Sequence, residues 1–253
     1  MGRVVSQPLR CTGMDTLVMV TGGSSGLGRA LLGSAPDGAF RVDISRSGPP
    51  DGVDDHVRAD LAEPASWPAV GAAVAARVAE RRWKRITVVH AAGTLDPIGF
   101  AGEVDGAAYT RNVLVNSAAG QVIGHHVLAA VSGVGARREL VLLSSGAARS
   151  AYPGWSSYGA AKAAIDQWVR VVGAEQATRG GVRVLSVAPG VVATPMQEAI
   201  RQSDPTDFPQ VDRFEQLYEQ GALADPLDAA RRLWALLDDD AVAGGTVVDL
   251  REH

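Results

Sequence analysis

The sequence holds a tyrosine, a lysine and a serine whose spacing suits proton transfer to an organic oxygen. Tyr158 and Lys162 are four residues apart, so on a helix they share one face. A phenol titrates near ~10, and a neighbouring ammonium favours its ionised form. Ser145 ends an apolar run and could hydrogen-bond a carbonyl oxygen while Tyr158 donates the proton. This set of three predicts reduction of a carbonyl group.

Asn116 is the fourth candidate for this set, because it lies in the middle of the long helical run that precedes Ser145. We expect it to hold a water molecule that bridges to Lys162, and an ordinary buried amide is the alternative. A tyrosine and a lysine four apart occur by chance on many helices. A strand-end serine and a glycine-rich turn in the same chain make chance a poor explanation.

The glycine-rich turn directly follows an apolar, strand-like run and opens a helical one. Glycines let the backbone turn sharply and approach a ligand, and the free N–H groups of a helix N-terminus favour an anion. The turn therefore predicts a dinucleotide diphosphate site. The residues assigned to it are Thr21, Gly22, Ser24, Ser25, Gly26, Leu27 and Gly28.

The tip of the second predicted strand selects between the two nicotinamide dinucleotides. An acid there accepts hydrogen bonds from the ribose hydroxyls and selects NAD, whereas an arginine pairs with the 2′-phosphate of NADP. If the strand runs through Ser45, Arg46 is the phosphate partner; if it ends at Asp43, the preference reverses. We favour the first alternative, with Ser45 and Arg46 as contacts and NADP(H) as the cofactor.

Further cofactor contacts are expected after the third and fourth strands. Asp60, followed by Leu61, could accept a hydrogen bond from the adenine amino group, and a helix N-cap near Glu63 is the alternative. The small residues Ala91, Ala92 and Gly93 would let the adenosine half pass close to the backbone. We assign His90 no proton-transfer role, and we assign no residue to a metal.

An alternation of strands and helices must position these residues. Strands are predicted at Leu17–Thr21, Phe40–Ile44, Ile86–His90, Leu140–Ser144, Val182–Val187 and Thr246–Leu250, with a short extra one at His56–Arg58. Helical patterns lie at Gly28–Gly33, Ala65–Arg82, Gly106–Val131, Ser157–Arg179 and Pro226–Asp238. Continuous apolar strands fit a parallel sheet covered on both faces. The prediction is an α/β fold, a single Rossmann-type doubly wound parallel sheet with helices on both faces.

The composition fits one domain of this kind. A chain of 253 residues with 46% hydrophobic and 21% charged residues is neither disordered nor fibrous. The net charge of −4 supplies no basic field, so nucleic acid is not an expected partner. The single cysteine, Cys11, cannot form an internal disulfide, and no apolar run approaches the ~18 residues of a membrane span. We therefore expect a cytoplasmic protein without membrane contact.

Two segments depart from the alternating pattern. Residues 1–13 precede the first strand and are expected to be a poorly ordered extension, so that the domain spans residues 14–253. Residues 195–224 carry two prolines, polar residues and only short helical patterns such as Phe214–Gln220. Such a segment is usually a substrate loop, and a plain surface excursion is the alternative. Trp155 and Met196 would supply apolar pocket walls, with Gln197 as a polar contact.

In their order along the chain, these motifs resemble those of the short-chain dehydrogenase/reductase family. The matching positions are Thr21 to Gly28, Asp60, Ala92-Gly93, Asn116, Ser145, Tyr158 with Lys162, and Pro189-Gly190 followed by Thr194. The resemblance implies that Pro189 and Gly190 pass beside the nicotinamide, whose carboxamide meets the Val192 backbone and the Thr194 hydroxyl. It also implies a homodimer or homotetramer built through Gly106–Val131 and Ser157–Arg179. His90-Ala91 stands where the family usually has Asn-Asn, which affects one local hydrogen bond and not the fold.

Within the family, the chain is similar to sepiapterin reductases and bacterial benzil reductases. The shared features include Ile44-Ser45-Arg46, Gly154-Trp155, Met196-Gln197 and the acid Asp249. Asp249 matches an acid that anchors the pterin in sepiapterin reductases, and solvation of a strand end is its alternative. Pro195 departs from the acid that those enzymes tend to have there. The predicted activity is NADPH-dependent reduction of a ketone, such as the vicinal diketone benzil, to a hydroxyketone. The alternatives are a sepiapterin reductase, an NAD-linked alcohol dehydrogenase and a dinucleotide sensor without turnover.

Overall fold

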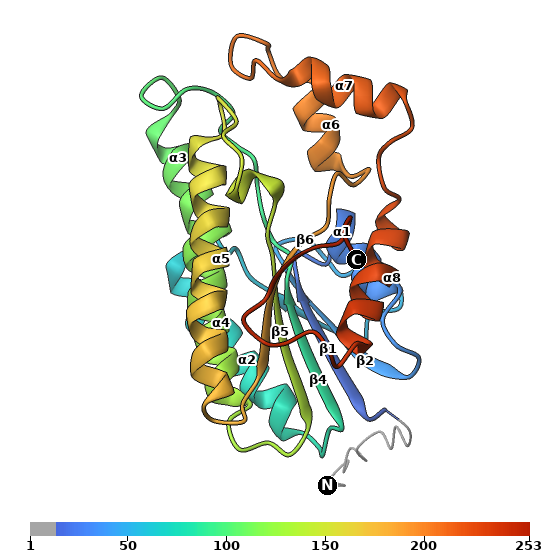
Figure 1. Cartoon of the computed structure of the whole chain (residues 1–253). Coiled ribbons are helices and arrows are strands. Elements are labelled where there is room, and N and C mark those ends of the chain that lie inside the picture. Colours follow the sequence, from blue (N-terminus) through green and yellow to red (C-terminus); the bar gives the residue numbers. More distant parts are fainter. Residues whose placement is uncertain (1–13) are drawn as a thin grey trace, which may run out of the picture.

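Seven parallel strands form the centre of the structure, a computed structural model that describes residues 14–253 (Figure 1). The strands are β1 (Thr16–Thr21), β2 (Ala39–Ser45), β3 (Asp55–Arg58), β4 (Arg85–His90), β5 (Arg137–Leu143), β6 (Arg183–Ala188) and β7 (Val247–Asp249). Their order in the sheet is β3-β2-β1-β4-β5-β6-β7. The order reverses between β1 and β4, and ligands of such sheets bind outside the carboxyl ends of the strands at this switch point. The predicted strands and the doubly wound sheet are thereby confirmed.

The helices also follow the predicted pattern, with shifted ends. They are α1 (Gly26–Gly33), α2 (Trp67–Ala79), α3 (Gly106–Val113), α4 (Ala119–Ala130), α5 (Ser156–Ala177), α6 (Pro195–Arg201), α7 (Val211–Glu219) and α8 (Pro226–Asp238). One predicted helix, Gly106–Val131, is interrupted by a wider π-helical turn at Leu114–Ala118. None of the described helices combines the length and the apolar character that crossing a bilayer requires. The predicted disorder of residues 1–13 lies outside the described residues.

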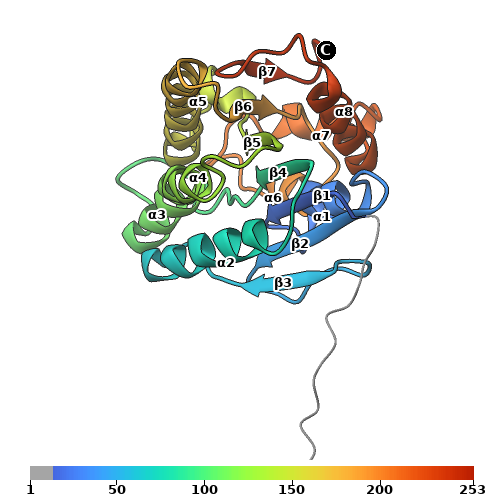
Figure 2. The ribbon, with the colours of Figure 1, turned by 90° about the horizontal axis from the view of Figure 1, so that it is seen from below.

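The strands bury both of their faces, as their continuous apolar sequences predict. In β1, Leu17 and Met19 pack into one core with α2, α4 and α5, whereas Val18 and Val20 pack into a second core with α1 and α8. All four side chains have no exposed surface. The view along the sheet from below shows the two helical layers on either side of it (Figure 2). Because side chains of a strand alternate between faces, one apolar run serves both cores.

The segment at residues 195–224 carries two short helices, α6 and α7, and α7 covers most of the predicted pattern Phe214–Gln220. Pro195 begins α6 where its fixed φ and missing N–H are tolerated. In α7, Val211, Phe214 and Leu217 recur at helical spacing and turn one apolar face toward the rest of the protein. Both helices lie above the carboxyl ends of the strands (Figure 1). Their buried residues join a third apolar cluster with Trp155 and Tyr158.

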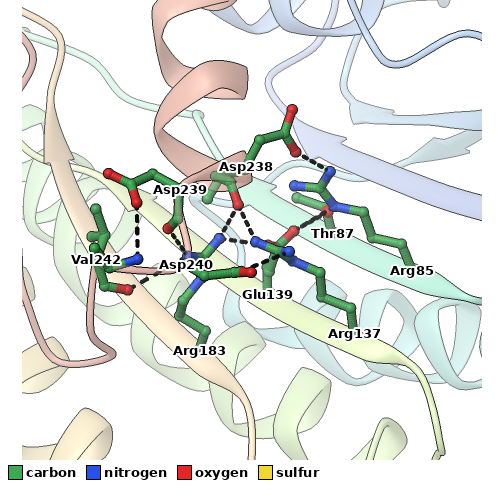
Figure 3. Close-up of polar contacts among 11 residues, drawn as sticks. Arg85, Thr87, Arg137, Glu139, Arg183, Asp238, Asp239, Asp240 and Val242 are labelled. Atoms are coloured by element: carbon green, nitrogen blue, oxygen red, sulfur yellow. Dashed lines mark hydrogen bonds and ion pairs between the residues drawn. The ribbon is translucent and has the colours of Figure 1, made fainter.

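A buried ionic network closes the opposite, amino end of the sheet (Figure 3). The Glu139 carboxylate on β5 accepts hydrogen bonds from three guanidinium groups and one hydroxyl. The donors are Arg85 at 2.8 Å, Arg137 at 2.8 Å, Arg183 at 2.7 Å and Thr87 at 2.7 Å. Arg85 also pairs with Asp238 at 2.6 Å, which ties the end of α8 to the sheet. Strand β5 begins at Arg137, three residues before the predicted start at Leu140. Its first residues are charged, and the ionic network pairs their charges within the fold.

Candidate active site

The three groups expected to react meet in one cavity of about 770 Å³ at the carboxyl ends of the strands. Tyr158 and Lys162 both lie in the first half of α5, and the Lys162 ammonium is 5.6 Å from the centre of the Tyr158 ring. Ser145 lies two residues after Leu143, the last residue of β5, and its hydroxyl accepts a hydrogen bond from the Ala147 N–H at 3.2 Å. All three side chains line the same cavity, as expected from the i, i+4 spacing of Tyr158 and Lys162 and from the position of Ser145 after a strand.

Asn116 is fully buried on the π-helical turn and does not line the cavity. Its amide nitrogen donates to the Thr94 carbonyl at 2.7 Å and to Asn112 at 2.9 Å, and its side-chain oxygen accepts from the Thr94 N–H at 3.1 Å. These bonds fix the segment after β4 that forms part of the cavity wall. They agree with the buried-amide alternative, and the water link to Lys162 stays a prediction.

Burial dominates the electrostatics of the reacting pair. It raises the pKa of Tyr158, and the Ser145 hydroxyl opposes this shift. Burial lowers the pKa of Lys162 to about 8, and the negative charge of Asp166 opposes that shift. The ammonium donates to the Leu143 carbonyl at 2.8 Å and not to the phenol. The lowering of the phenol pKa that the sequence predicts is therefore outweighed here by desolvation.

His90 carries no charge at neutral pH, which agrees with giving it no proton-transfer role. Burial and the nearby Lys162 charge lower its pKa to about 3. One ring nitrogen lies 3.0 Å from the Thr21 hydroxyl, which itself accepts from the Ala92 N–H at 3.2 Å. Thr21 is fully buried and does not line the cavity. Thr21 links the end of β1, where the glycine-rich turn begins, to the end of β4.

The glycine-rich turn has the shape that a dinucleotide diphosphate requires. At Gly22 the backbone φ is +71°, and a Cβ would lie 2.8 Å from the Ala92 Cα. At Gly28 a Cβ would lie 2.3 Å from the Gly22 carbonyl oxygen. Larger residues would therefore force β1, β4 and α1 apart. The first turn of α1 lines the cavity, and the Ser25 side chain does not cap this helix. The N–H groups of that turn are therefore left without a side-chain acceptor, as an anion site requires.

At the tip of β2 the strand runs through Ser45, which is the first of the two alternatives. Asp43 has no exposed surface; it accepts hydrogen bonds from the Ser45 hydroxyl at 2.7 Å and contacts the His56 ring at 2.9 Å. Asp43 does not line the cavity, whereas Ser45 and Arg46 do. Arg46 is exposed, and within residues 14–253 no carboxylate lies within ion-pair distance of it.

The remaining cofactor candidates line the same cavity. They are Ser24, Ser25, Gly26, Leu27, Asp60, Leu61, Ala91, Ala92, Gly93, Pro189, Gly190, Val192 and Thr194. Asp60 accepts a hydrogen bond from the Ala62 N–H at 3.0 Å and lies 3.5 Å from Arg111. This bond closes a local turn before the short helix at Pro64–Ser66 and is not a helix cap, since no side chain caps that helix or α2. Asp60 lines the cavity wall, and its contact with adenine stays a prediction.

The substrate candidates lie together beyond Tyr158. Trp155 stacks on Phe208 with ring centres 4.5 Å apart, and Met196 and Gln197 come from the first turn of α6. Gln197 is buried, and its side-chain oxygen accepts a hydrogen bond from Arg201. Asp249 also lines the cavity; its side chain is only 1% exposed and binds two arginines, which argues against a solvated strand end, and its contact with a substrate stays a prediction.

Sequence reasoning missed several residues of this outer wall. Tyr152, Arg213, Phe214, Leu217 and Arg251 all line the cavity. The apolar spacing of Val211, Phe214 and Leu217 was a usable signal for α7. No local signal marks Arg213 or Arg251, because only the folded chain brings α7 and the end of β7 to the same rim.

Comparisons with known proteins agree with this geometry. A family model described as Enoyl-(Acyl carrier protein) reductase matches residues 44–248. Benzil reductase ((S)-benzoin forming) of Bacillus subtilis is 31% identical over 172 residues, covering 68% of this chain and 70% of that protein. Sepiapterin reductase of Rattus norvegicus is 31% identical over 171 residues, covering 66% of this chain and 64% of that protein.

A solved structure extends the similarity to nearly the whole described fold. A short-chain dehydrogenase/reductase from Saccharomyces cerevisiae superposes with a TM-score of 0.80 at 25% identity. The match covers 93% of this chain and 96% of the yeast chain. The seven-stranded sheet with its helical layers is thus a fold that a known short-chain dehydrogenase/reductase structure shares.

Proposed function

Because the chain belongs to the short-chain dehydrogenase/reductase family, we propose that it is an NADPH-dependent carbonyl reductase acting on a vicinal diketone. Membership makes it an oxidoreductase of small molecules; the cofactor, the direction and the substrate are the proposal. One observation carries it: Ser145, Tyr158 and Lys162 line the same cavity as the glycine-rich turn. A dinucleotide sensor would need the turn but not these three groups.

The choice of NADPH over NADH rests on the tip of β2. Asp43 has no exposed surface and does not line the cavity, and its Oδ2 is held by Ser45 and His56. Arg46 lies on the cavity wall with no carboxylate partner within the described residues, so a 2′-phosphate can take that place. When bound, the dinucleotide supplies a hydride to the carbonyl carbon and becomes oxidised.

The protein's own groups complete the reduction. Ser145 donates a hydrogen bond to the carbonyl oxygen as negative charge grows on it. The Tyr158 phenol then transfers its proton to that oxygen, and the carbonyl becomes a hydroxyl group. The charged form of Lys162 favours the resulting phenolate, although desolvation holds the lysine pKa at about 8. Trp155 and Met196 keep the reacting centre in apolar surroundings.

The substrate class follows from the outer wall and from the relatives. Aromatic and apolar side chains dominate it, which suits a flat aryl diketone, and benzil reductases are among the similar proteins. The geometry disfavours a sepiapterin reductase, because both oxygens of Asp249 are occupied by arginines and are not free to accept from a pterin. We therefore keep benzil-like diketones, reduced to hydroxyketones, as the proposed substrates.

The test is a cofactor-oxidation screen that crosses NADPH and NADH with benzil, sepiapterin, diacetyl and simple aryl ketones. We expect oxidation of NADPH, fastest with benzil, and slow turnover with NADH. Oxidation of NADH alone would overturn the cofactor assignment. Consumption of NADPH with sepiapterin but not with benzil would overturn the substrate assignment.

We further propose that two or four copies associate through Gly106–Val131, which contains α3 and α4, and through α5. Support comes from Val113 on α3 and Val171 on α5, which leave 39% and 49% of their surface exposed, since two apolar side chains on this helical layer suit burial against a second copy. Light scattering coupled to gel filtration tests this, with a Val171→Glu variant expected to shift the mass toward the monomer. A monomeric wild type would contradict it.

A further inference from the structure

Two arginines from distant parts of the chain meet at the outer rim of the cavity. Arg213 lies on α7, and Arg251 follows β7 near the C-terminus. Arg213 donates to the Tyr152 hydroxyl at 3.2 Å, and the Arg251 charge also acts on Tyr152. Both arginines line the cavity, so they face the space in which a substrate would lie.

The rim carries more positive than negative charge. Arg251 uses two nitrogens on Asp249, at 2.9 and 2.6 Å, and Asp249 also accepts from Arg149 at 3.1 Å. One buried carboxylate thus orients two guanidinium groups. Arg213 has no carboxylate within 4.0 Å among the described residues; its hydrogen-bond partner is the Tyr152 hydroxyl. Glu252 acts on Arg251 from the exposed chain end.

An aromatic wall connects this rim to the reacting phenol. Trp155 contacts the Tyr158 ring edge-on with centres 5.8 Å apart, and it contacts the Tyr152 ring at 5.0 Å. All three rings line the cavity. An aryl group lying along this wall would place one end at Tyr158 and a substituent on its far end near Arg213 and Arg251.

We propose that Arg213 and Arg251 bind a carboxylate carried by the substrate at the end remote from the ketone. The substrate class then narrows to aryl diketones or ketones with a ring carboxylate, and this rests on the proposed function. A carboxylate matches the planar fork of an arginine, and both residues keep unused donors: Arg251 one terminal nitrogen, Arg213 its Nε and its other terminal nitrogen. Asp249 is a positioning residue that holds Arg251 at the rim.

The experiment compares 4-carboxybenzil, its methyl ester and the corresponding phosphonate in wild type, Arg213→Gln and Arg251→Gln. Arg82→Gln is the matched control, because Arg82 is exposed beside the amino end of β4, far from the cavity. We expect each rim variant to lose about tenfold in kcat/KM for the acid, while ester turnover and the KM for NADPH stay within about twofold. Added salt should lower kcat/KM for the acid in wild type and much less in Arg213→Gln.

Equal losses on acid and ester, no wild-type preference for the acid, or a raised KM for NADPH would each overturn the assignment. A phosphonate preferred tenfold over the carboxylate would overturn the choice of ligand. Turnover of the ester with no effect of charge would leave the proposed reductase intact and remove only this site. If wild type reduces none of the three, calorimetric binding of 4-carboxybenzil in the presence of NADPH decides: weakening in Arg213→Gln supports the site, and unchanged or absent binding overturns it.

Discussion

The Lys162 ammonium donates a hydrogen bond to the Leu143 carbonyl at 2.8 Å, at the point where β5 ends. This bond anchors the start of α5 to the sheet and keeps the lysine beside Tyr158. Burial lowers the pKa of the Lys162 ammonium to about 8, although the negative charge of Asp166 opposes this shift. Lys162 therefore titrates just above neutrality, in a position where its charge acts on the phenol.

A pH dependence follows from that titration. Below about pH 8 the lysine carries its charge and favours the phenolate that forms when the proton leaves Tyr158; above it, this support is lost. We expect kcat/KM for ketone reduction to fall as pH rises through about 8. Steady-state rates from pH 6 to 10 measure this. In Lys162→Arg, any remaining activity should keep its plateau to higher pH, and a wild-type profile that is flat to pH 10 would contradict the assignment.

Arg46 should control the choice of cofactor. Arg46→Ala removes the group placed to pair with a 2′-phosphate, so the KM for NADPH should rise by at least about tenfold, as for a lost charged hydrogen bond. The KM for NADH should change little. Asp43→Asn is the contrasting variant, because Asp43 is buried and its loss should lower stability without changing the preference. Equal changes in the KM values for NADPH and NADH in Arg46→Ala would mean that another residue distinguishes the 2′-phosphate from the free ribose hydroxyl.

Met196 should discriminate between large and small ketones. It comes from the start of α6 and packs against the apolar cluster that contains Trp155 and Tyr158. Met196→Ala should weaken transition-state binding of benzil by about 1–3 kcal/mol and spare diacetyl, because only the larger substrate fills that part of the wall. Values of kcat/KM for the two substrates measure the difference. Equal losses on both would indicate an effect through folding or cofactor placement.

Glu139, whose contacts are drawn in Figure 3, should matter for stability and not for chemistry, since it lies near the start of β5 and the cavity lies at the end of that strand. Burial alone would raise the pKa of its carboxyl, but hydrogen bonds from Arg85, Arg137 and Thr87 hold it below the usual range. A lowered pKa contributes stability above the unfolded value near ~4.3 and loses it as pH falls through the folded value.

Glu139→Gln should therefore lower the free energy of unfolding by about 3 kcal/mol at pH 7, because it leaves three partly buried arginines without the charge of their shared acceptor. The difference from wild type should shrink as pH falls below about 4. Urea titrations at several pH values measure this. Asp238→Asn is the control and should cost less, since that carboxylate is 64% exposed. A variant as stable as wild type at pH 7 would contradict the role of the network.

Local patterns were sufficient for most of the fold and for the reacting groups. The apolar strands, the turn from Thr21 to Gly28 and the Tyr158–Lys162 pair each act over a few residues, so their spacing alone predicts their placement. The end of β2 was ambiguous because Asp43 and Ser45 both suit a strand tip. The full burial of Asp43 and its contact with His56 on β3 show that the acid points into the structure.

The outer pocket depended on contacts that sequence spacing does not encode. Asp249 was recognised as an acid at a strand end, but its partners Arg149 and Arg251 follow two different strands. The sequence places Asn116 in the reacting set, whereas in the structure its amide donates to Thr94 and Asn112. In both cases the hydrogen-bond partners are set by tertiary packing, and they change what the side chain is free to do.

The most direct test of the account is the rate of NADPH oxidation with benzil in Tyr158→Phe, measured together with the dissociation constant for NADPH. The substitution removes the proton donor and little contact area, so kcat should fall by about 10²–10⁴ while NADPH binding stays within a few-fold of wild type. Full turnover in this variant would contradict the assignment of Tyr158 as the proton donor, and with it the proposed reductase mechanism.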